Sequence, residues 1–324
     1  MHLLMRTILV SGASGIIGYG ILKSLRLSHP ECRLIGTTVY ERSAAPAFCD
    51  VFEKAPLTNH ESYLPWLLDV IQRHQVSMVI PGIEVDVVAW NEHRDTIEQS
   101  GAQVLLNDAD LIRLCADKWQ FYQSLVKNKS PYAIPTSLEF DETSQRFPLL
   151  LKPRKGSGSK GIVIVNDIDE LRKHLGGAGQ GMMIQPVIGT EEEEYTTSAF
   201  FDRDSRLYAF HTLKRTLSEA GFTETAETVE LEGVQDALLH FGKIFKPVGP
   251  TNFQFRVDGG QLRLLEINPR ISSSTSLRAA FGYNESAMSV EWMLDGKVPD
   301  QPVLKQGYAV RYTEDLIFYD RTHL

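Results

Sequence analysis

A carboxylate, an amide and a guanidinium follow one another where an apolar run ends, at Glu266, Asn268 and Arg270. Side chains alternate between the two faces of a strand, so Glu266 and Asn268 should share one face, about 7 Å apart. Their oxygens suit a hard cation such as Mg²⁺, and Arg270 offers a bidentate fork to phosphate. The spacing predicts a site for metal and phosphate. A surface strand with a capping Asn and a turn Pro is the plainer alternative.

A second alternating segment, Asn252-Phe253-Gln254, precedes this one and should form a neighbouring strand. Its amides would then lie beside the carboxylate of Glu266, and Gln254 is a third candidate ligand. Oxygen ligands next to a fixed arginine are typical of a site for a nucleoside triphosphate with its metal ion.

A basic, glycine-rich loop joins two apolar runs between Phe147 and Val165, and Lys152 lies at the end of the first run. Glycines let backbone N–H groups approach phosphate oxygens closely. The loop connects two strands, so it is a hairpin flap and not a P-loop, which would open a helix. An ordinary basic hairpin turn is the alternative. The candidate phosphate-binding residues of the loop are Gly156, Ser157, Gly158 and Gly161.

A third segment runs from an apolar strand through a short linker into acids, from Met182 to Thr197. The linker at Gln185, Pro186 and Val187 could hydrogen-bond the edge of an adenine, and a carboxylate could accept hydrogen bonds from ribose hydroxyls. For three of the four consecutive glutamates a solvated turn is the better interpretation. The exception is Glu194.

In this order the three segments resemble the ATP-grasp superfamily, and within it short proteins related to the synthetase units of the carbamoyl-phosphate synthase large subunit. The resemblance covers roughly residues 110–300 and is most specific at Glu266-Ile-Asn-Pro-Arg270. It implies that Lys118 and Lys152 bind the phosphates of ATP, and that Arg270 faces the transferred phosphate. The remaining implied contacts are Mg²⁺ (or Mn²⁺) at Gln254, Glu266 and Asn268, adenine at Gln185 to Val187, and ribose at Glu194.

The implied reaction is an ADP-forming ligation in which ATP phosphorylates a small carboxylate and an amine-type nucleophile displaces the phosphate. Lys214 and Arg215, at the end of another expected strand, could stabilise the acyl phosphate, or could be solvated strand-end charges. His211 in that strand is better explained as a buried structural residue than as a base.

Synthesis of carbamoyl phosphate from bicarbonate is the nearest rival reaction. The single set of motifs argues against it.

Composition narrows the class of protein. The formal net charge is −8, so no nucleic-acid partner is expected. No apolar run approaches the roughly 20 residues of a membrane span, and we expect neither a membrane partner nor a signal peptide. The three cysteines lack the spacing of a metal site and favour a cytoplasmic location. A homodimer is left open.

The first hundred residues alternate expected strands and helices, which predicts a Rossmann-like parallel sheet. The strands are expected at 7–11, 33–39, 77–81 and 103–106, and the helices at 16–27, 63–74 and 87–100. Gly12, Gly15 and Gly18 resemble the fingerprint of an NAD(P)-dependent reductase, the second rival. No acid ends the second strand where a ribose partner would stand. Glu84 or Asp86, after the third strand, could contact an amine substrate or simply favour the helix dipole.

We therefore expect an α/β chain with an N-terminal pre-ATP-grasp domain, residues 1–109, and a two-lobed α+β ATP-grasp domain, residues 110–324. The small lobe should span about 120–186 and the large lobe about 187–324. A long helical stretch with Asp108 or Asp110 at its start should begin the second domain.

Overall fold

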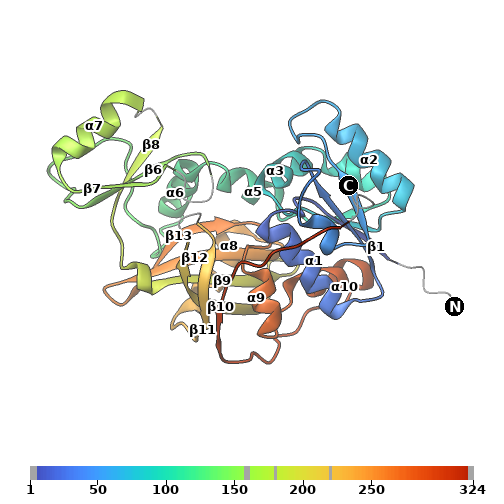
Figure 1. The fold of residues 1–324 in the computed structure, drawn as a ribbon. Helices are drawn as coiled ribbons and strands as arrows, with labels where there is room; N and C mark the ends of the chain where they lie inside the picture. Colours follow the sequence, from blue (N-terminus) through green and yellow to red (C-terminus); the bar gives the residue numbers. More distant parts are fainter. Residues whose placement is uncertain (1–5, 157–160, 179–180, 219–220, 320–324) are drawn as a thin grey trace.

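The computed structural model describes residues 6–156, 161–178, 181–218 and 221–319 (Figure 1). The predicted loop residues Ser157 and Gly158 lie outside these ranges. Three sheets build the fold, and the large cavity discussed below lies where they meet. The predicted class, a parallel N-terminal sheet followed by antiparallel sheets, is confirmed.

The N-terminal sheet is parallel throughout and has the strand order β3-β2-β1-β4-β5. Its two faces bury two apolar clusters, one around Trp90 and one around Ile21. Its strands are β1 (Thr7–Val10), β2 (Arg33–Thr38), β3 (Val51–Lys54), β4 (Met78–Ile80) and β5 (Gln103–Val104). Its helices are α1 (Ile16–Ser28), η1 (Ala45–Ala47), α2 (Tyr63–His74), α3 (Glu84–Glu92) and α4 (Arg94–Gln99).

Three local predictions need correction. The sheet has five strands, because β3 forms an edge strand beside β2 that its mixed sequence Val-Phe-Glu-Lys did not reveal. The single helix expected at 87–100 begins at Glu84 and is divided at His93. The long helix expected after Asn107 is two helices, α5 (Ala109–Cys115) and α6 (Lys118–Lys127), because Asp117 caps the second.

A three-stranded antiparallel sheet, order β7-β6-β8, stands apart from the rest of the molecule at the upper left of Figure 1. As predicted, β6 and β7 form a hairpin, and helix α7 covers the sheet over a small core of its own around Leu149. The elements are β6 (Leu149–Pro153), β7 (Val163–Val165), α7 (Ile168–Ala178) and β8 (Met182–Pro186).

A six-stranded sheet, order β13-β12-β9-β10-β11-β14, forms the base of the molecule. Phe253 and Phe255 of β12 stack beneath helix α8 on Phe241, and this aromatic cluster anchors one face of the sheet. The strands are β9 (Glu194–Phe201), β10 (Leu207–Leu217), β11 (Thr223–Thr228), β12 (Gly249–Asp258), β13 (Gln261–Asn268) and β14 (Tyr308–Val310). The helices are η2 (Glu191–Glu193), α8 (Val234–Phe245), α9 (Thr275–Ala280) and α10 (Glu285–Asp295).

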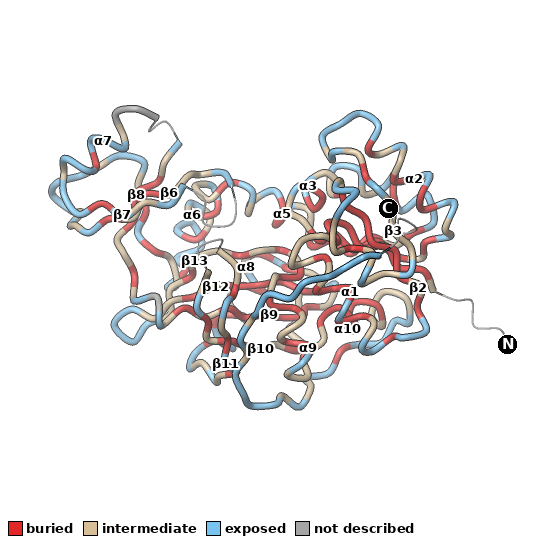
Figure 2. The backbone as a smooth tube through the Cα atoms, in the orientation of Figure 1, coloured by how far each residue is buried: buried red, intermediate tan, exposed pale blue. Residues whose placement is uncertain are grey.

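Helices α9 and α10 lie against α1, so the end of the chain packs on its beginning (Figure 1). Ile271 and Val290 belong to the same apolar cluster as Ile21 and Val10 of the N-terminal sheet. Figure 2 shows buried residues along the strands of the N-terminal sheet and of the six-stranded sheet. Most described residues of α7, which covers the three-stranded sheet, are exposed. In the described ranges, no helix has both the length and the apolar character that a membrane span requires.

A fully buried ion pair joins α9 to α10, and its hydrogen bonds reach β9 and β12. Arg278 of α9 and Glu285 of α10 are both 0% exposed, and their closest charged atoms are 3.5 Å apart. Arg278 Nη1 also donates to Ser272 Oγ at 2.6 Å, and Nη2 donates to Asn252 Oδ1 at 3.0 Å. Burial raises the pKa of Glu285, and the charge of Arg278 opposes that rise. Removing either partner would leave the other charge buried without compensation.

We predict that Glu285→Ala lowers the free energy of unfolding by about 3–5 kcal/mol, because it leaves the guanidinium of Arg278 uncompensated. Urea titration followed by circular dichroism measures the change. Glu41→Ala, which removes the exposed ion pair with Lys54, is the control and should leave the midpoint nearly unchanged. Equal midpoints for Glu285→Ala and the wild type would contradict the structural role of the pair.

Candidate functional site

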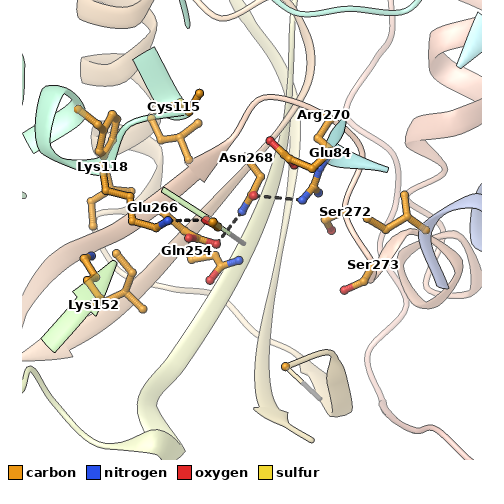
Figure 3. A pocket seen from close by; sticks show the side chains of 18 of the residues that line it. Glu84, Cys115, Lys118, Lys152, Gln254, Glu266, Asn268, Arg270, Ser272 and Ser273 are labelled. Carbon is orange, nitrogen blue, oxygen red and sulfur yellow. Dashed lines mark hydrogen bonds and ion pairs between the residues drawn. The ribbon is translucent and has the colours of Figure 1, made fainter. Parts of the chain in front are cut away.

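A cavity of about 780 Å³ opens between the N-terminal sheet, the α5–α6 segment and the other two sheets. The turn after β4, the first residues of α1, the ends of β6 and β13 and the middle of β12 form its walls. Figure 3 shows the polar side chains that face into it from these elements. The predicted site residues that line it are Lys118, Lys152, Gly156, Gln185, Arg215, Gln254, Glu266, Asn268 and Arg270.

A chain of polar contacts crosses the cavity wall from β13 to α3. Asn268 Nδ2 donates to Glu266 Oε1 at 2.9 Å, so the two side chains share a face, as their spacing predicted. Arg270 Nη2 donates to Asn268 Oδ1 at 3.2 Å, and its Nε donates to Glu84 Oε2 at 2.7 Å (Figure 3). The guanidinium of Arg270 is therefore held at the cavity between a carboxylate and an amide.

The neighbouring strand adds a third oxygen donor. Gln254 of β12 pairs with Glu266 of β13, so their side chains leave the sheet on the same side. A carboxylate and two amides form a hard donor set that suits Mg²⁺ or Mn²⁺. In the structure Asn268 turns its Nδ2 toward Glu266, and a half-turn of the amide would present Oδ1 instead. The side chains present thus fit a divalent cation.

Two lysines from different elements face this acidic edge. Lys118 begins α6 and its Nζ donates to the backbone oxygen of Gly156 at 2.5 Å. Lys152 lies near the end of β6. Burial lowers the pKa of Lys152 to about 8; Glu266 opposes this shift and Lys118 adds to it. Two cations beside a carboxylate provide a binding site for an anion of several charges.

Asp117 positions both lysines, and its role was not predicted. Its carboxylate accepts hydrogen bonds from Trp119 N at 3.0 Å and Gln120 N at 3.3 Å, which caps α6 and places Lys118 in the first turn. It also forms an ion pair with Arg154 at 2.6 Å, directly after β6. Burial opposes ionisation, but Arg154 and the backbone donors lower the pKa of Asp117. An Asp before a helix was the signal that could have revealed this cap.

Part of the cavity lining is apolar. It is formed by Phe121, Leu125, Ile134, Met183 and Leu264. Gln185 of β8 also lines the cavity, and its Nε2 donates to Thr136 Oγ1 at 2.6 Å. Pro186 and Val187 lie outside the set of described residues that line the cavity. Their contact with an adenine stays a prediction.

Glu194 is buried, and both of its carboxylate oxygens bind arginines. Arg215 Nη2 and Arg256 Nη2 each donate to it at 2.9 Å. The strand register that pairs Lys214 with Tyr195 places Arg215 beside Glu194. Arg215 lines the cavity, whereas Glu194 and Lys214 lie outside the described lining residues. Glu194 thus orients Arg215 toward the cavity, and its contact with a ribose stays a prediction.

The glycines of the first loop are explained by close packing. A Cβ on Gly18 would lie 2.3 Å from the backbone oxygen of Gly12, and Gly12 itself has φ +59°. The loop, α1 and the turn after β4 touch backbone to backbone, which requires glycine without any dinucleotide. Thr37 and Thr38 are buried at the end of β2, where an acid would bind a ribose. Within the described residues, the reductase hypothesis therefore rests on the glycine spacing alone.

Two further residues considered in the sequence are structural. Asp86 is buried and accepts hydrogen bonds from Thr58 at 2.6 Å and Tyr63 at 2.9 Å, away from the cavity lining. His211 is fully buried against Thr228, and burial lowers its pKa to about 3, so it is neutral at physiological pH. Among the acids in the first turn of α3, Glu84 is the one that reaches the cavity.

Two family models match overlapping parts of the chain. One describes an ATP-grasp domain and matches residues 115–210. The other describes an ATP-grasp protein in the biosynthetic pathway with the Ter operon and matches residues 180–316. Together they cover the three-stranded sheet, the six-stranded sheet and every residue predicted to bind ATP or the metal ion.

Curated relatives and solved structures point to the same superfamily as the two family models. Human mitochondrial carbamoyl-phosphate synthase [ammonia] is 28% identical over 159 residues, which are 45% of this chain and 10% of that protein. N5-Carboxyaminoimidazole synthetase from Staphylococcus aureus, complexed with ADP, superposes with a TM-score of 0.71 at 14% identity, over 94% of this chain and 82% of the other. The biotin carboxylase domain of 2-oxoglutarate carboxylase from Hydrogenobacter thermophilus, complexed with MgADP, ADP and bicarbonate, gives 0.69 at 14% identity, over 95% and 74%. The chain is a member of the ATP-grasp superfamily, with distant similarity to segments of the carbamoyl-phosphate synthase large chain.

Proposed function

We propose that this protein is an ATP-dependent ligase that phosphorylates a small carboxylate and couples the acyl phosphate to an amine. The observation that carries the proposal is the meeting of Glu266, Gln254 and Asn268 with Lys118 and Lys152 in one cavity. These groups supply oxygen ligands for a cation and two positive charges for phosphates. Proteins with the same fold have been solved in complex with ADP or MgADP, which supports ATP as the nucleotide of this protein.

ATP would lie with its base at the apolar part of the lining, near Gln185, and with its phosphates between Lys118 and Lys152. Phosphoryl transfer depends mostly on positioning and on neutralising charge. Mg²⁺ held by Gln254, Glu266 and Asn268 supplies positive charge against the phosphates when bound. Arg270 faces the same space and can donate to the oxygens of the transferred group.

The carboxylate and amine would bind on the side of the cavity formed by α1, α3 and Arg215. Arg215 can pair with a carboxylate there, because Glu194 holds its guanidinium in place from behind. Glu84 carries the negative charge that an ammonium group would seek, although Arg270 contacts it in the present structure. An incoming amine would compete with Arg270 for Glu84, and this competition would free the guanidinium for phosphate.

The domain division follows from the same assignment. We propose a pre-ATP-grasp domain at residues 1–109 that contributes the acceptor side, and an ATP-grasp domain at 110–324 whose lobes, 120–186 and 187–324, hold the nucleotide between them. The free thiols Cys32, Cys49 and Cys115 support a cytoplasmic enzyme.

Phosphorylation of bicarbonate, as in carbamoyl-phosphate synthesis, is the second candidate reaction. The bicarbonate in the biotin carboxylase domain complex and the similarity to carbamoyl-phosphate synthase favour it. The matched segment is a small part of that synthase, so the carboxylate ligase is our first choice.

We predict that Glu266→Gln slows ATP-dependent phosphate release by a factor on the order of 10² or more, because it removes charge from the metal site while keeping the shape. A coupled phosphate assay at saturating Mg²⁺ measures the change. Glu227→Gln, on an exposed part of β11, is the matched control and should retain activity. Unchanged turnover of Glu266→Gln would rule out its role as ligand.

We predict that ATP affinity falls as the pH rises above about 8, because the free enzyme then loses the proton of Lys152. The bound phosphates favour the charged lysine, so binding takes up a proton and weakens by up to about tenfold per pH unit. Isothermal titration calorimetry from pH 6.5 to 9.5 measures the ATP affinity. The acceptor substrate is left out so that ATP is not consumed. Lys152→Arg stays charged and should show a flat profile. An equally steep profile in that variant would assign the proton to another group.

We predict ADP and an acyl phosphate as products when the correct carboxylate is given without the amine. Hydroxylamine should trap the acyl phosphate as a hydroxamate, and chromatography should identify the nucleotide. A screen of amino acids, sugar acids and bicarbonate with phosphate release as readout finds the substrate. AMP as the main nucleotide would refute the acyl-phosphate route, and ADP formed only with bicarbonate would select the second candidate.

A further inference from the structure

The loop between α1 and β2 carries a group of side chains that the proposed reaction does not use. Gly15 and Ile16, at the beginning of α1, line the nucleotide cavity, whereas His29 follows the last residue of the helix. A 13-residue helix is about 20 Å long, so the loop lies well away from the cavity. Any ligand bound here belongs to a second site.

Three chemically different donors converge in this loop. The donor atoms of His29, Glu31 and Cys32 all lie within 4.8 Å of one another. His29 Nδ1 is 3.2 Å from Glu31 Oε1, and Cys32 Sγ is 3.9 Å from the same oxygen. A tetrahedral Zn²⁺ with bonds of about 2.0–2.3 Å needs donors about 3.3–3.6 Å apart. The two separations lie within a few tenths of an ångström of this range and the third is at most 4.8 Å, so small side-chain rotations can bring the three atoms around one ion.

The backbone of the loop is what brings these donors together. His29 N donates to Leu25 O at 2.7 Å and Cys32 N donates to His29 O at 3.1 Å, which closes a tight turn. His29 and Cys32 are buried, while Glu31 is exposed and leaves a path from solvent. A deep sulfur and nitrogen with an outer carboxylate suit a borderline cation better than Mg²⁺.

The second nitrogen of His29 provides an independent indication. Nε2 is buried and has no hydrogen-bond partner among the described parts of the chain. It faces Glu291 of α10, whose Oε1 is 3.8 Å away. Metal-binding histidines commonly donate their other N–H to a carboxylate. When Nδ1 binds a cation, the proton must sit on Nε2, where Glu291 can accept it.

Nearby positive charges are already neutralised. Arg6 forms an ion pair with Asp295, and Arg26 forms one with Asp50 at 2.6 Å. The thiolate of Cys32 and the carboxylate of Glu31 together balance the charge of a divalent ion. Binding converts the thiol to a thiolate and releases its proton to solvent.

We propose that His29 Nδ1, Glu31 and Cys32 Sγ bind one Zn²⁺, with water as the fourth ligand. The ion joins the α1–β2 loop to Glu291 through the imidazole and so fastens the N-terminal sheet to α10. Its position away from the cavity makes it a structural site. Without the ion, the same side chains form the hydrogen bonds from His29 and Cys32 to Glu31.

Co²⁺ in place of Zn²⁺ tests the proposal by a signal independent of activity. The full-length chain in a Glu266→Gln background, stripped with a chelator, is titrated with Co²⁺. We expect one ion per chain and a thiolate-to-cobalt charge-transfer band in the near ultraviolet. Zn²⁺ should displace the Co²⁺ and raise the melting temperature. Failure to bind stoichiometric Co²⁺ would overturn the proposal.

Variants locate the ion. Cys32→Ser should abolish the charge-transfer band, whereas Cys49→Ser, at a thiol that contacts Ala45 O in the same part of the fold, should keep it. Cys32 is buried, so Cys32→Ser could also destabilise the fold. Glu31→Gln serves as a second variant, because its side chain is exposed and the substitution should not unfold the protein. It should weaken Co²⁺ binding at least tenfold. A band that persists in Cys32→Ser, or affinity unchanged in Glu31→Gln, would place the ion elsewhere and refute the site.

Discussion

The buried guanidinium of Arg278 is the constraint on which the base of the site depends. It donates to Ser272 after β13, to Thr196 of β9 and to Asn252 of β12, and Glu285 balances its charge. The two strands β9 and β12, which are 82 and 26 residues away in sequence at the contacting positions, thus share one buried cation with the segment around α9. A charge in such surroundings is stabilised by a partner of opposite charge and by hydrogen bonds to its donor groups. The strand ends that carry the catalytic candidates are held by these contacts.

The polar groups of the cavity compensate one another before any substrate binds. Glu266 lies beside Lys152, and Arg270 lies between Glu84 and Asn268. An isolated buried charge would be costly, so each group has a partner of opposite sign or a hydrogen bond. Any charged ligand that enters the cavity has to replace some of these internal partners with its own charges.

The sequence predicted those site residues whose relation is local. Strand alternation placed Glu266 and Asn268 on one face, and the apolar runs gave the hairpin at Lys152 correctly. Contacts between segments that are distant in sequence could not be predicted. Arg270 and Glu84 are 186 residues apart, and the sequence at the end of a strand does not reveal which helix it will contact. The ribose contact of Glu194 was implied by the resemblance and stays a prediction. The ion pair of Glu194 with Arg215 was not predicted, because the strand register that places them side by side is set by the folded sheet. The division of the long helix at Asp117 was missed because both halves have helical composition.

Packing also determines which part of the molecule can move. The N-terminal sheet and helix α10 share one apolar cluster, so these two parts behave as a single body. The three-stranded sheet has a separate small core around Leu149, and the ion pair of Arg154 with Asp117 ties its strand β6 to α6. Local stability follows the density of buried contacts. Any closing of this sheet over the cavity would therefore turn about the Asp117–Arg154 contact, which keeps Lys118 and Lys152 close to each other while their distance from Glu266 changes.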